Sequence, residues 1–101
     1  MWFSKLKSGV DPEAYEEWVR RTDYALAQEV DCILSYKVYR VQGPFQHKVP
    51  GDFDYIEIVK ITDNDAYRDA LKNHPSMDVI IGQINTFVVG TGDVICHEIE
   101  A

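Results

Sequence analysis

The sequence predicts an α+β domain made of two strand–helix–strand halves. Two segments have the apolar spacing of amphipathic helices, and each is flanked by segments rich in β-branched and aromatic residues. The chain has 101 residues and contains no Pro-, Gly- or Ser-rich linker that could separate two cores. We therefore expect residues 1–101 to form a single domain.

The first half is predicted to be a strand, a long helix and a second strand. Residues 1–7 are rich in Trp, Phe and Leu and predict the first strand. Asp11 and Pro12 predict a helix start, because aspartate accepts a hydrogen bond from the first turn and proline is tolerated there. The helix is expected to run to about Val30. Its buried face is predicted to consist of Tyr15, Trp18, Val19, Thr22, Ala25 and Leu26.

Two further strands are predicted on either side of the loop Pro44–Gly51. Cys32–Val41 is dense in β-branched and aromatic residues, and Asp52–Ile61 alternates with a period of two. In an antiparallel pair these segments lie side by side, so their side chains are expected to meet.

The second half repeats the pattern with an interrupted helix. Thr62 or Asp63 is the predicted N-cap, and Pro75 disfavours helical backbone at His74, so a break is expected there. Ser76 is expected to cap a second short helix. Met77, Ile80, Ile81 and Ile84 would line one side of that helix, although Val79–Ile81 also fits a strand.

The chain is expected to end in a turn at Gly90–Gly92 and a last strand at Asp93–Glu100. The resulting order β-α-β-β-α-β is that of the ferredoxin-like fold, with four antiparallel strands and both helices on one face. The other face would expose apolar residues such as Phe53, Ile58 or Ile95. We therefore expect a homodimer in which a second copy covers this face.

Composition excludes several classes of partner. There are 17 acidic and 10 basic residues, a net charge of −7, which repels nucleic acid and anionic lipid. No apolar run approaches the roughly 20 residues of a membrane span, and we expect a cytoplasmic protein. Cys32 and Cys96 are widely spaced, so neither a disulfide nor a metal site is expected.

The candidate functional residues are histidines and aromatic residues. His74 is fixed at the helix break, where its side chain need not follow helical packing. His97 alternates with apolar residues on the last predicted strand, and it is either a pocket residue or a hydrogen-bonded core residue. His47 lies in the polar loop and is expected to be solvated. Nucleotide-binding, serine-hydrolase and zinc-protease motifs are absent from the sequence.

Polar and aromatic side chains from the two middle strands are expected to form a pocket under the helices. Glu57 is costly to bury in an apolar strand unless it is paired or functional. Such a pocket suits a flat, largely apolar ligand, although ordinary sheet packing explains the same residues. Its predicted members are Trp18, Tyr36, Tyr39, Tyr55 and Glu57.

Three segments carry a family resemblance, which extends over nearly the whole chain. They are YKVYRVQG at Tyr36–Gly43, DYIEIVKITD at Asp54–Asp63 and NHPSM at Asn73–Met77. The sequence resembles the RedY-like proteins of the dimeric α/β-barrel superfamily. Proteins of this family are encoded with pathways for prodigiosin-type tripyrrole pigments and related bisindoles.

The resemblance implies a homodimer without a cofactor that binds a small aromatic or pyrrole-type intermediate. It implies a functional histidine, which by position is His74, with His97 as the rival. In our leading hypothesis the protein promotes condensation, cyclisation or rearrangement of the intermediate. His74 would move a proton, Tyr39 and Tyr55 would orient polar atoms, Glu57 would set a partner's charge and Trp18 would stack on the ring. The alternatives are a non-catalytic carrier or chaperone and a cofactor-free monooxygenase.

Overall fold

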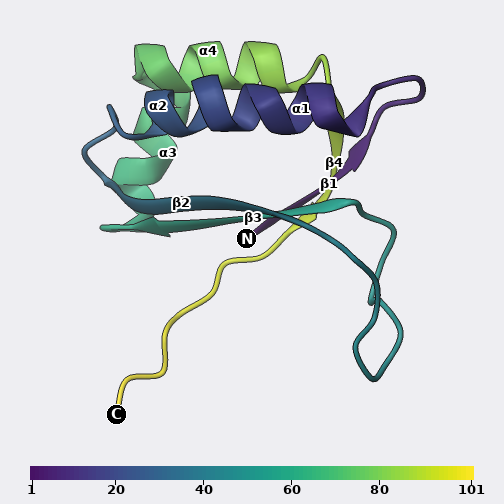
Figure 1. The fold of residues 1–101 in the computed structure, drawn as a ribbon. Helices are drawn as coiled ribbons and strands as arrows, with labels where there is room; N and C mark the ends of the chain where they lie inside the picture. Colours follow the sequence, from purple (N-terminus) through teal and green to yellow (C-terminus); the bar gives the residue numbers. More distant parts are fainter.

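A computed structural model describes residues 1–101 and contains a four-stranded sheet with a helical layer on one face (Figure 1). The strand order is β2-β3-β1-β4, and all neighbouring strands are antiparallel. This confirms the predicted α+β, ferredoxin-like arrangement. The elements are β1 Trp2–Leu6, α1 Pro12–Trp18, the π-helix η1 Val19–Asp23, α2 Tyr24–Ala27, β2 Ile33–Arg40, β3 Tyr55–Ile61, α3 Asn64–Asn73, α4 Pro75–Ile84 and β4 Val88–Asp93.

The first helix starts as predicted but changes its winding. The Asp11 side chain accepts a hydrogen bond from the Glu13 amide, and Pro12 is the first helical residue. From Val19 to Asp23 the helix has π-type hydrogen bonds, which widen the turn. The wider turn keeps every fourth residue on one face, so Tyr15, Val19, Asp23 and Ala27 are the buried residues. The predicted face was therefore wrong in its second half, where Ala25 is exposed.

The second helix breaks at His74, as predicted. Asp63 is the N-cap of α3, and its side chain accepts from the Ala66 amide at 2.7 Å. His74 has extended backbone (φ −79°, ψ 127°) and is the N-cap of α4. The prediction that Ser76 caps this helix was wrong: Ser76 lies in its first turn, and its hydroxyl donates to the Glu29 carboxylate at 2.6 Å. Val79–Ile81 is helical.

The end of the chain differs from the prediction. Gly90–Gly92 belongs to β4 and pairs with β1 instead of forming a turn. Gly90 leaves room for the Trp2 side chain, because a Cβ at this position would lie 2.8 Å from the indole nitrogen. Backbone pairing ends where the Val94 amide donates to the Met1 carbonyl. Residues 95–101, which we call the arm, are extended and exposed and form no strand. His97 therefore lies in the arm and not on a strand.

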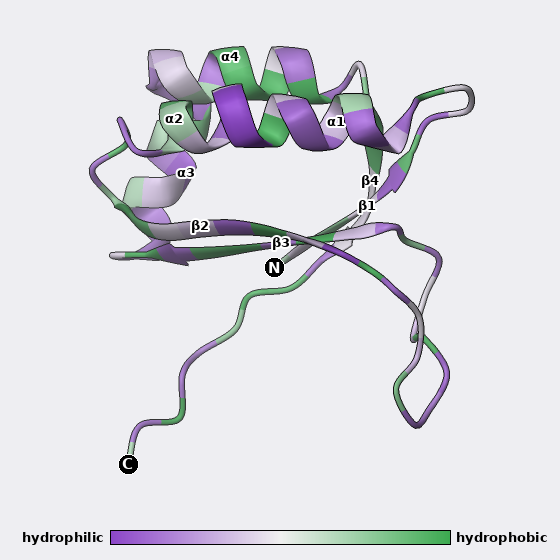
Figure 2. Cartoon of the chain, in the orientation of Figure 1, coloured by the Kyte–Doolittle hydropathy of each residue, from purple (hydrophilic) through white to green (hydrophobic).

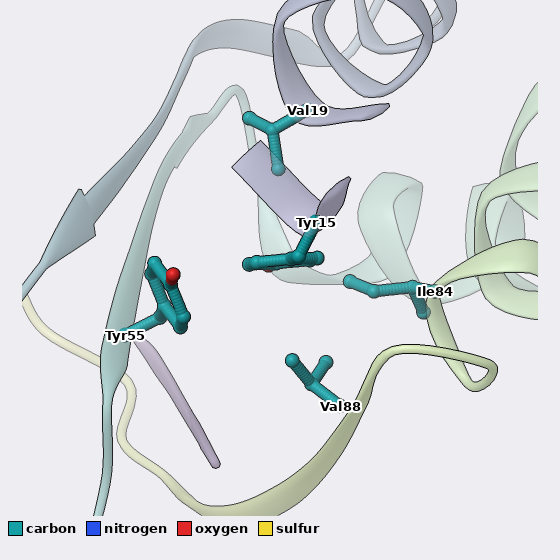
Figure 3. Packing of buried hydrophobic residues seen from close by; sticks show 5 residues of the cluster. All are labelled: Tyr15, Val19, Tyr55, Ile84 and Val88. Carbon is teal, nitrogen blue, oxygen red and sulfur yellow. The ribbon is translucent and has the colours of Figure 1, made fainter. Parts of the chain in front are cut away.

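The core lies between the sheet and the helical layer as two apolar clusters. In the first, Figure 3 shows Tyr15 between Tyr55 of β3 and Ile84 of α4, and the Tyr15 and Tyr55 rings are 4.7 Å apart. The second contains Ala27, Val30, Ala70, Met77 and Ile80. These side chains fill the space under the helices with aromatic and aliphatic groups.

The opposite face of the sheet is not covered by any element, and we call it the open face. Alternation along each strand places apolar side chains on it, and green segments continue along β3 and into the chain after β4 (Figure 2). The residues involved are Phe3, Tyr39, Phe53, Ile56, Ile58 and Val89. Tyr39 is half exposed here, so Tyr36 and not Tyr39 faces the helices.

Two carboxylic acids are buried beneath the π-helix. The Tyr36 hydroxyl donates to both carboxylate oxygens of Asp23, at 2.9 and 3.1 Å. Burial raises the pKa of Asp23 to about 6 and, together with the nearby Asp23 charge, raises the pKa of Glu57 to about 7. We call Asp23, Tyr36 and Glu57 the buried acid group.

The buried acid group should make stability depend on pH. Both acids have a higher pKa in the native state than in the unfolded chain, so the native state binds more protons between about pH 4 and pH 7. Stability is therefore expected to decrease as pH rises through this range. Urea unfolding should give a loss on the order of 3 kcal/mol between pH 5 and pH 8.

Asp23→Asn should reduce this slope, because one titrating group is removed and Glu57 loses a neighbouring charge. Asp65→Asn, at an exposed position in α3, is the control and should keep the slope of the unchanged protein. Equal slopes for Asp23→Asn and the unchanged protein would contradict the assignment.

Candidate functional site

A cleft lies where the helical layer meets the start of β2. It has a volume of about 300 Å³ and is formed by the loop between α2 and β2, the end of α3 and the break between α3 and α4. We call it the His74 cleft. Its lining residues are Val30, Asp31, Cys32, Asp69, Ala70, Asn73, His74 and Pro75.

His74 is held in this cleft by its role as helix cap. The ring is half-buried, and its Nδ1 accepts a hydrogen bond from the Ser76 amide at 3.1 Å. A nitrogen that accepts a hydrogen bond carries no proton, so the neutral ring has its proton on Nε2. The cap therefore fixes the tautomer and leaves Nε2–H as the nitrogen available to a ligand.

The rest of the cleft combines an apolar floor with acidic groups. Val30 and Ala70 belong to the second core cluster. Asp69 accepts a hydrogen bond from the side-chain amide of Asn73 at 2.8 Å, and Cys32 is a free, half-buried thiol. Asp31 makes no side-chain hydrogen bond or ion pair, so its carboxylate can accept an N–H from a bound molecule.

A second, smaller cleft of about 130 Å³ is lined on one side by an ion pair. Arg40 donates two hydrogen bonds to Glu16, at 2.9 and 2.7 Å, and the Tyr55 hydroxyl donates to the same carboxylate at 2.8 Å. The Arg40 hydrogen bonds lower the pKa of Glu16. This volume is room for about four water molecules, so the cleft suits solvent better than an organic ligand.

The structure does not gather the sequence-predicted residues into one pocket. Tyr36 and Glu57 belong to the buried acid group, Tyr55 borders the smaller cleft, and Tyr39 lies on the open face. The Trp18 indole donates to Gln83 of α4 at 2.8 Å, and its ring packs against both core clusters. The single pocket expected under the helices is absent because the two core clusters fill that space.

The rival histidine His97 and the loop histidine His47 also lie away from the His74 cleft. His97 is in the exposed arm and His47 is in the exposed loop between β2 and β3. Among the predicted site residues, only His74 lines the larger cleft.

Sequence reasoning missed most of the cleft. Asp69 and Asn73 lie one turn apart at the end of α3. The predicted break at His74 indicated that the helix ends directly after them, so their side chains could have been expected to lie beside His74. Asp31 and Cys32 gave no local signal, because they reach the cleft only through the return of the chain from the first helix to β2.

Two other kinds of feature are absent from the structure. No group of three or more His, Cys, Asp or Glu side chains is placed to hold a metal ion. None of the helices combines the length and the apolar character needed to cross a bilayer.

Comparison with known proteins identifies relatives of this fold. Residues 1–99 match the family model described as REDY-like protein HapK. The crystal structure of HapK from Hahella chejuensis superposes with a TM-score of 0.74 at 20% identity, over 99% of this chain and 94% of that one. No match was found among curated protein sequences. Because the family model spans nearly the whole chain, the protein belongs to the REDY-like HapK family, which associates it with secondary-metabolite biosynthesis.

Proposed function

We propose that this protein binds a small aromatic or pyrrole-type intermediate in the His74 cleft, as a homodimer and without a cofactor. The pathway would be of the prodigiosin type, and the reaction a condensation, cyclisation or rearrangement. The observation that carries the proposal is the capped His74 ring, which offers one defined N–H to a cleft of about 300 Å³.

The size and chemistry of the cleft support a ligand of this class. Small-molecule pockets range from about 300 to 1,000 Å³, so this cleft is at the small end and suits a molecule of one or two rings. Val30 and Ala70 offer an apolar surface for a flat ring. Asp31 and Asp69 offer carboxylate oxygens, which accept the N–H that a pyrrole or indole must satisfy when it leaves water.

His74 would act as the proton-transfer residue. Imidazole exchanges protons near neutral pH and is the commonest general acid or base in enzymes. With Nδ1 engaged by the Ser76 amide, proton transfer is assigned to Nε2. The neutral capped ring cannot give up its Nε2 proton, because that would leave an imidazolate anion. In the proposed step the ring first takes a proton from solvent at Nδ1, which releases the Ser76 amide, and the cationic ring then donates its Nε2 proton to the intermediate. Loss of the Nδ1 proton and uptake of a proton at Nε2 from solvent restore the capped tautomer.

The homodimer part of the proposal rests on the open face. Its apolar side chains are covered by no element of the chain, and burying them against a second sheet is favourable. The loop between β2 and β3 and the arm both project on this side of the sheet (Figure 1). In the proposed dimer the sheet of the second copy would lie between this loop and the arm.

Two substitutions at His74 separate its structural and chemical roles. His74→Asn keeps a side-chain acceptor for the Ser76 amide, so the free energy of unfolding should change little. His74→Ala removes the cap and should cost about 1 kcal/mol. Both should lower pathway flux by roughly 100-fold or more if His74 transfers a proton. Thermal unfolding and pigment output measured on both variants check this.

Full pigment output in the folded His74→Asn variant would remove the proposed role of the histidine. Loss of output in His74→Ala alone would assign His74 to stability only.

A ligand should be found on the protein when it is taken directly from the producing cell. Native mass spectrometry is expected to detect a small molecule at one per subunit. Asp69→Leu, which removes an acceptor at an exposed side chain of the cleft, should lower its occupancy. Incubation of purified protein with that molecule then separates two outcomes: product formation supports an enzyme, and saturable binding without product supports a carrier.

A charge on the open face should separate the subunits. Tyr39 is 50% exposed on this face, so Tyr39→Glu is tolerated in a monomer but places a carboxylate in the proposed interface. Light scattering is expected to give the mass of two chains for the unchanged protein and of one chain for the variant. Val79→Glu, at a similarly exposed position on α4, is the control and should stay dimeric. A monomeric unchanged protein would contradict the proposal.

A further inference from the structure

One hydrogen bond joins two walls of the His74 cleft. The Ser76 hydroxyl, in the first turn of α4, donates to the Glu29 carboxylate at 2.6 Å. Glu29 lies in the turn after α2 and precedes the cleft residue Asp31 by two positions. Ser76 follows the cleft residue His74 by two positions. The bond therefore connects the wall that carries Asp31 with the wall that carries His74.

This bond determines how the two walls are placed relative to each other. No other hydrogen bond links residues 28–32 to α4. The other contact between the two walls is apolar packing within the second core cluster, which contains Val30 and Met77. Apolar contacts fill space without a preferred direction, whereas a hydrogen bond sets both a distance and an angle. The geometry between the walls therefore depends on Glu29 and Ser76.

The surroundings of Ser76 strengthen its hydrogen bond to Glu29. Ser76 is only 6% exposed, so its hydroxyl needs a partner within the protein. A hydrogen bond to a carboxylate is shorter and stronger than one between neutral groups. The negative charge of Glu29 also lies at the start of the ten-residue helix α4, where the helix dipole favours an anion.

Ser76 transmits this restraint to the histidine. The residue that donates from its hydroxyl to Glu29 also donates from its amide to His74 Nδ1, at 3.1 Å. The orientation of the ring depends on this amide, so it depends on the position of Ser76. In the proposed reaction Nδ1 leaves the amide when it takes a proton. The bond between Ser76 and Glu29 does not involve Nδ1, so it persists and keeps the amide in place for the return of the ring.

We infer that Glu29 is a positioning residue of the cleft. Acting through Ser76, it holds the Nε2–H group of His74 at a fixed place relative to the Asp31 carboxylate. The inference rests on the proposed function for its consequence, which is that a bound intermediate contacts both groups at once. Glu29 does not line the cleft, so its effect on a ligand is indirect.

Nitrogen NMR of the His74 ring tests the positioning without any ligand. At pH 8 an ordinary imidazole is neutral, and the unchanged protein should show a proton on Nε2 and none on Nδ1. Glu29→Ala should give a mixture of the two tautomers, because the Ser76 amide is no longer held. Glu29→Gln should restore the original signals, because its side-chain oxygen accepts from the Ser76 hydroxyl. A role in stability alone would not change the tautomer.

Three further variants complete this measurement. His74→Asn identifies the signals of the ring. Gln28→Ala is the control, since Gln28 is an exposed neighbour of Glu29 whose side chain forms no hydrogen bond, and it should leave the signals unchanged. Ser76→Ala should reproduce the effect of Glu29→Ala. Combining these two substitutions should add nothing to the change in the ring signals, because both remove the same hydrogen bond.

A small pyrrole tests the consequence for binding. Pyrrole-2-carboxaldehyde is the probe, because its N–H can donate to Asp31 and its carbonyl oxygen can accept from Nε2 of His74. In a titration followed by NMR, Glu29→Ala should raise the Kd by roughly ten-fold, the equivalent of one hydrogen bond. Glu29→Gln and Gln28→Ala should keep the Kd of the unchanged protein.

The outcomes separate the positioning role from the proposed function. Mixed tautomers in Glu29→Ala that are restored in Glu29→Gln support the inference. Ring signals that are unchanged in Glu29→Ala, or that are not restored in Glu29→Gln, overturn it. Ring signals that respond as expected in a protein that does not bind the pyrrole remove the proposed ligand class and leave the positioning role standing.

Discussion

The helical layer covers only one face of the four-stranded sheet, and the rest of the structure depends on this asymmetry. On the covered face, Tyr15, Tyr55 and Val88 pack into an apolar core that excludes water. On the uncovered face, Tyr39 and its neighbours remain in contact with solvent in a single subunit. A chain of 101 residues buries a smaller share of its unfolded surface than a larger domain does, so apolar area left outside the core is a substantial loss of stability. The proposed dimer recovers part of it.

His74 connects the fold with the proposed chemistry. Its extended backbone separates α3 from α4, and its Nδ1 caps α4. The same hydrogen bond fixes the tautomer and orients the ring. The cap that α4 needs at its first turn therefore also leaves Nε2–H as a defined hydrogen-bond donor. This is why a residue at a helix break, and not one in the packed core, lines the larger cleft.

The buried acid group and the π-helix are two aspects of one adjustment. An aspartate on the buried face of a helix is costly unless its charge is removed or hydrogen-bonded. The π-turn brings Asp23 onto that face, where Tyr36 donates to it, and burial favours the protonated form of its carboxyl group. π-turns within helices occur often at functional sites. Here the turn places Asp23 against Tyr36 of β2 and near Glu57 of β3, and none of these three residues lines either cleft.

Local physical chemistry determined the features that sequence analysis predicted correctly: the element order, the caps at Asp11 and Asp63 and the break at His74. Each depends on residues within a few positions of one another. Only the tertiary structure decided that Tyr36 faces the helices, that Gly90 lies within a strand against Trp2, and that residues 95–101 leave the sheet. The tertiary structure also decided which residues line the cleft, because Asp31 and His74 are far apart in the sequence. These outcomes depend on strand register and on which side chains, distant in the sequence, pack into the same space. The local sequence pattern determines neither the register nor this packing.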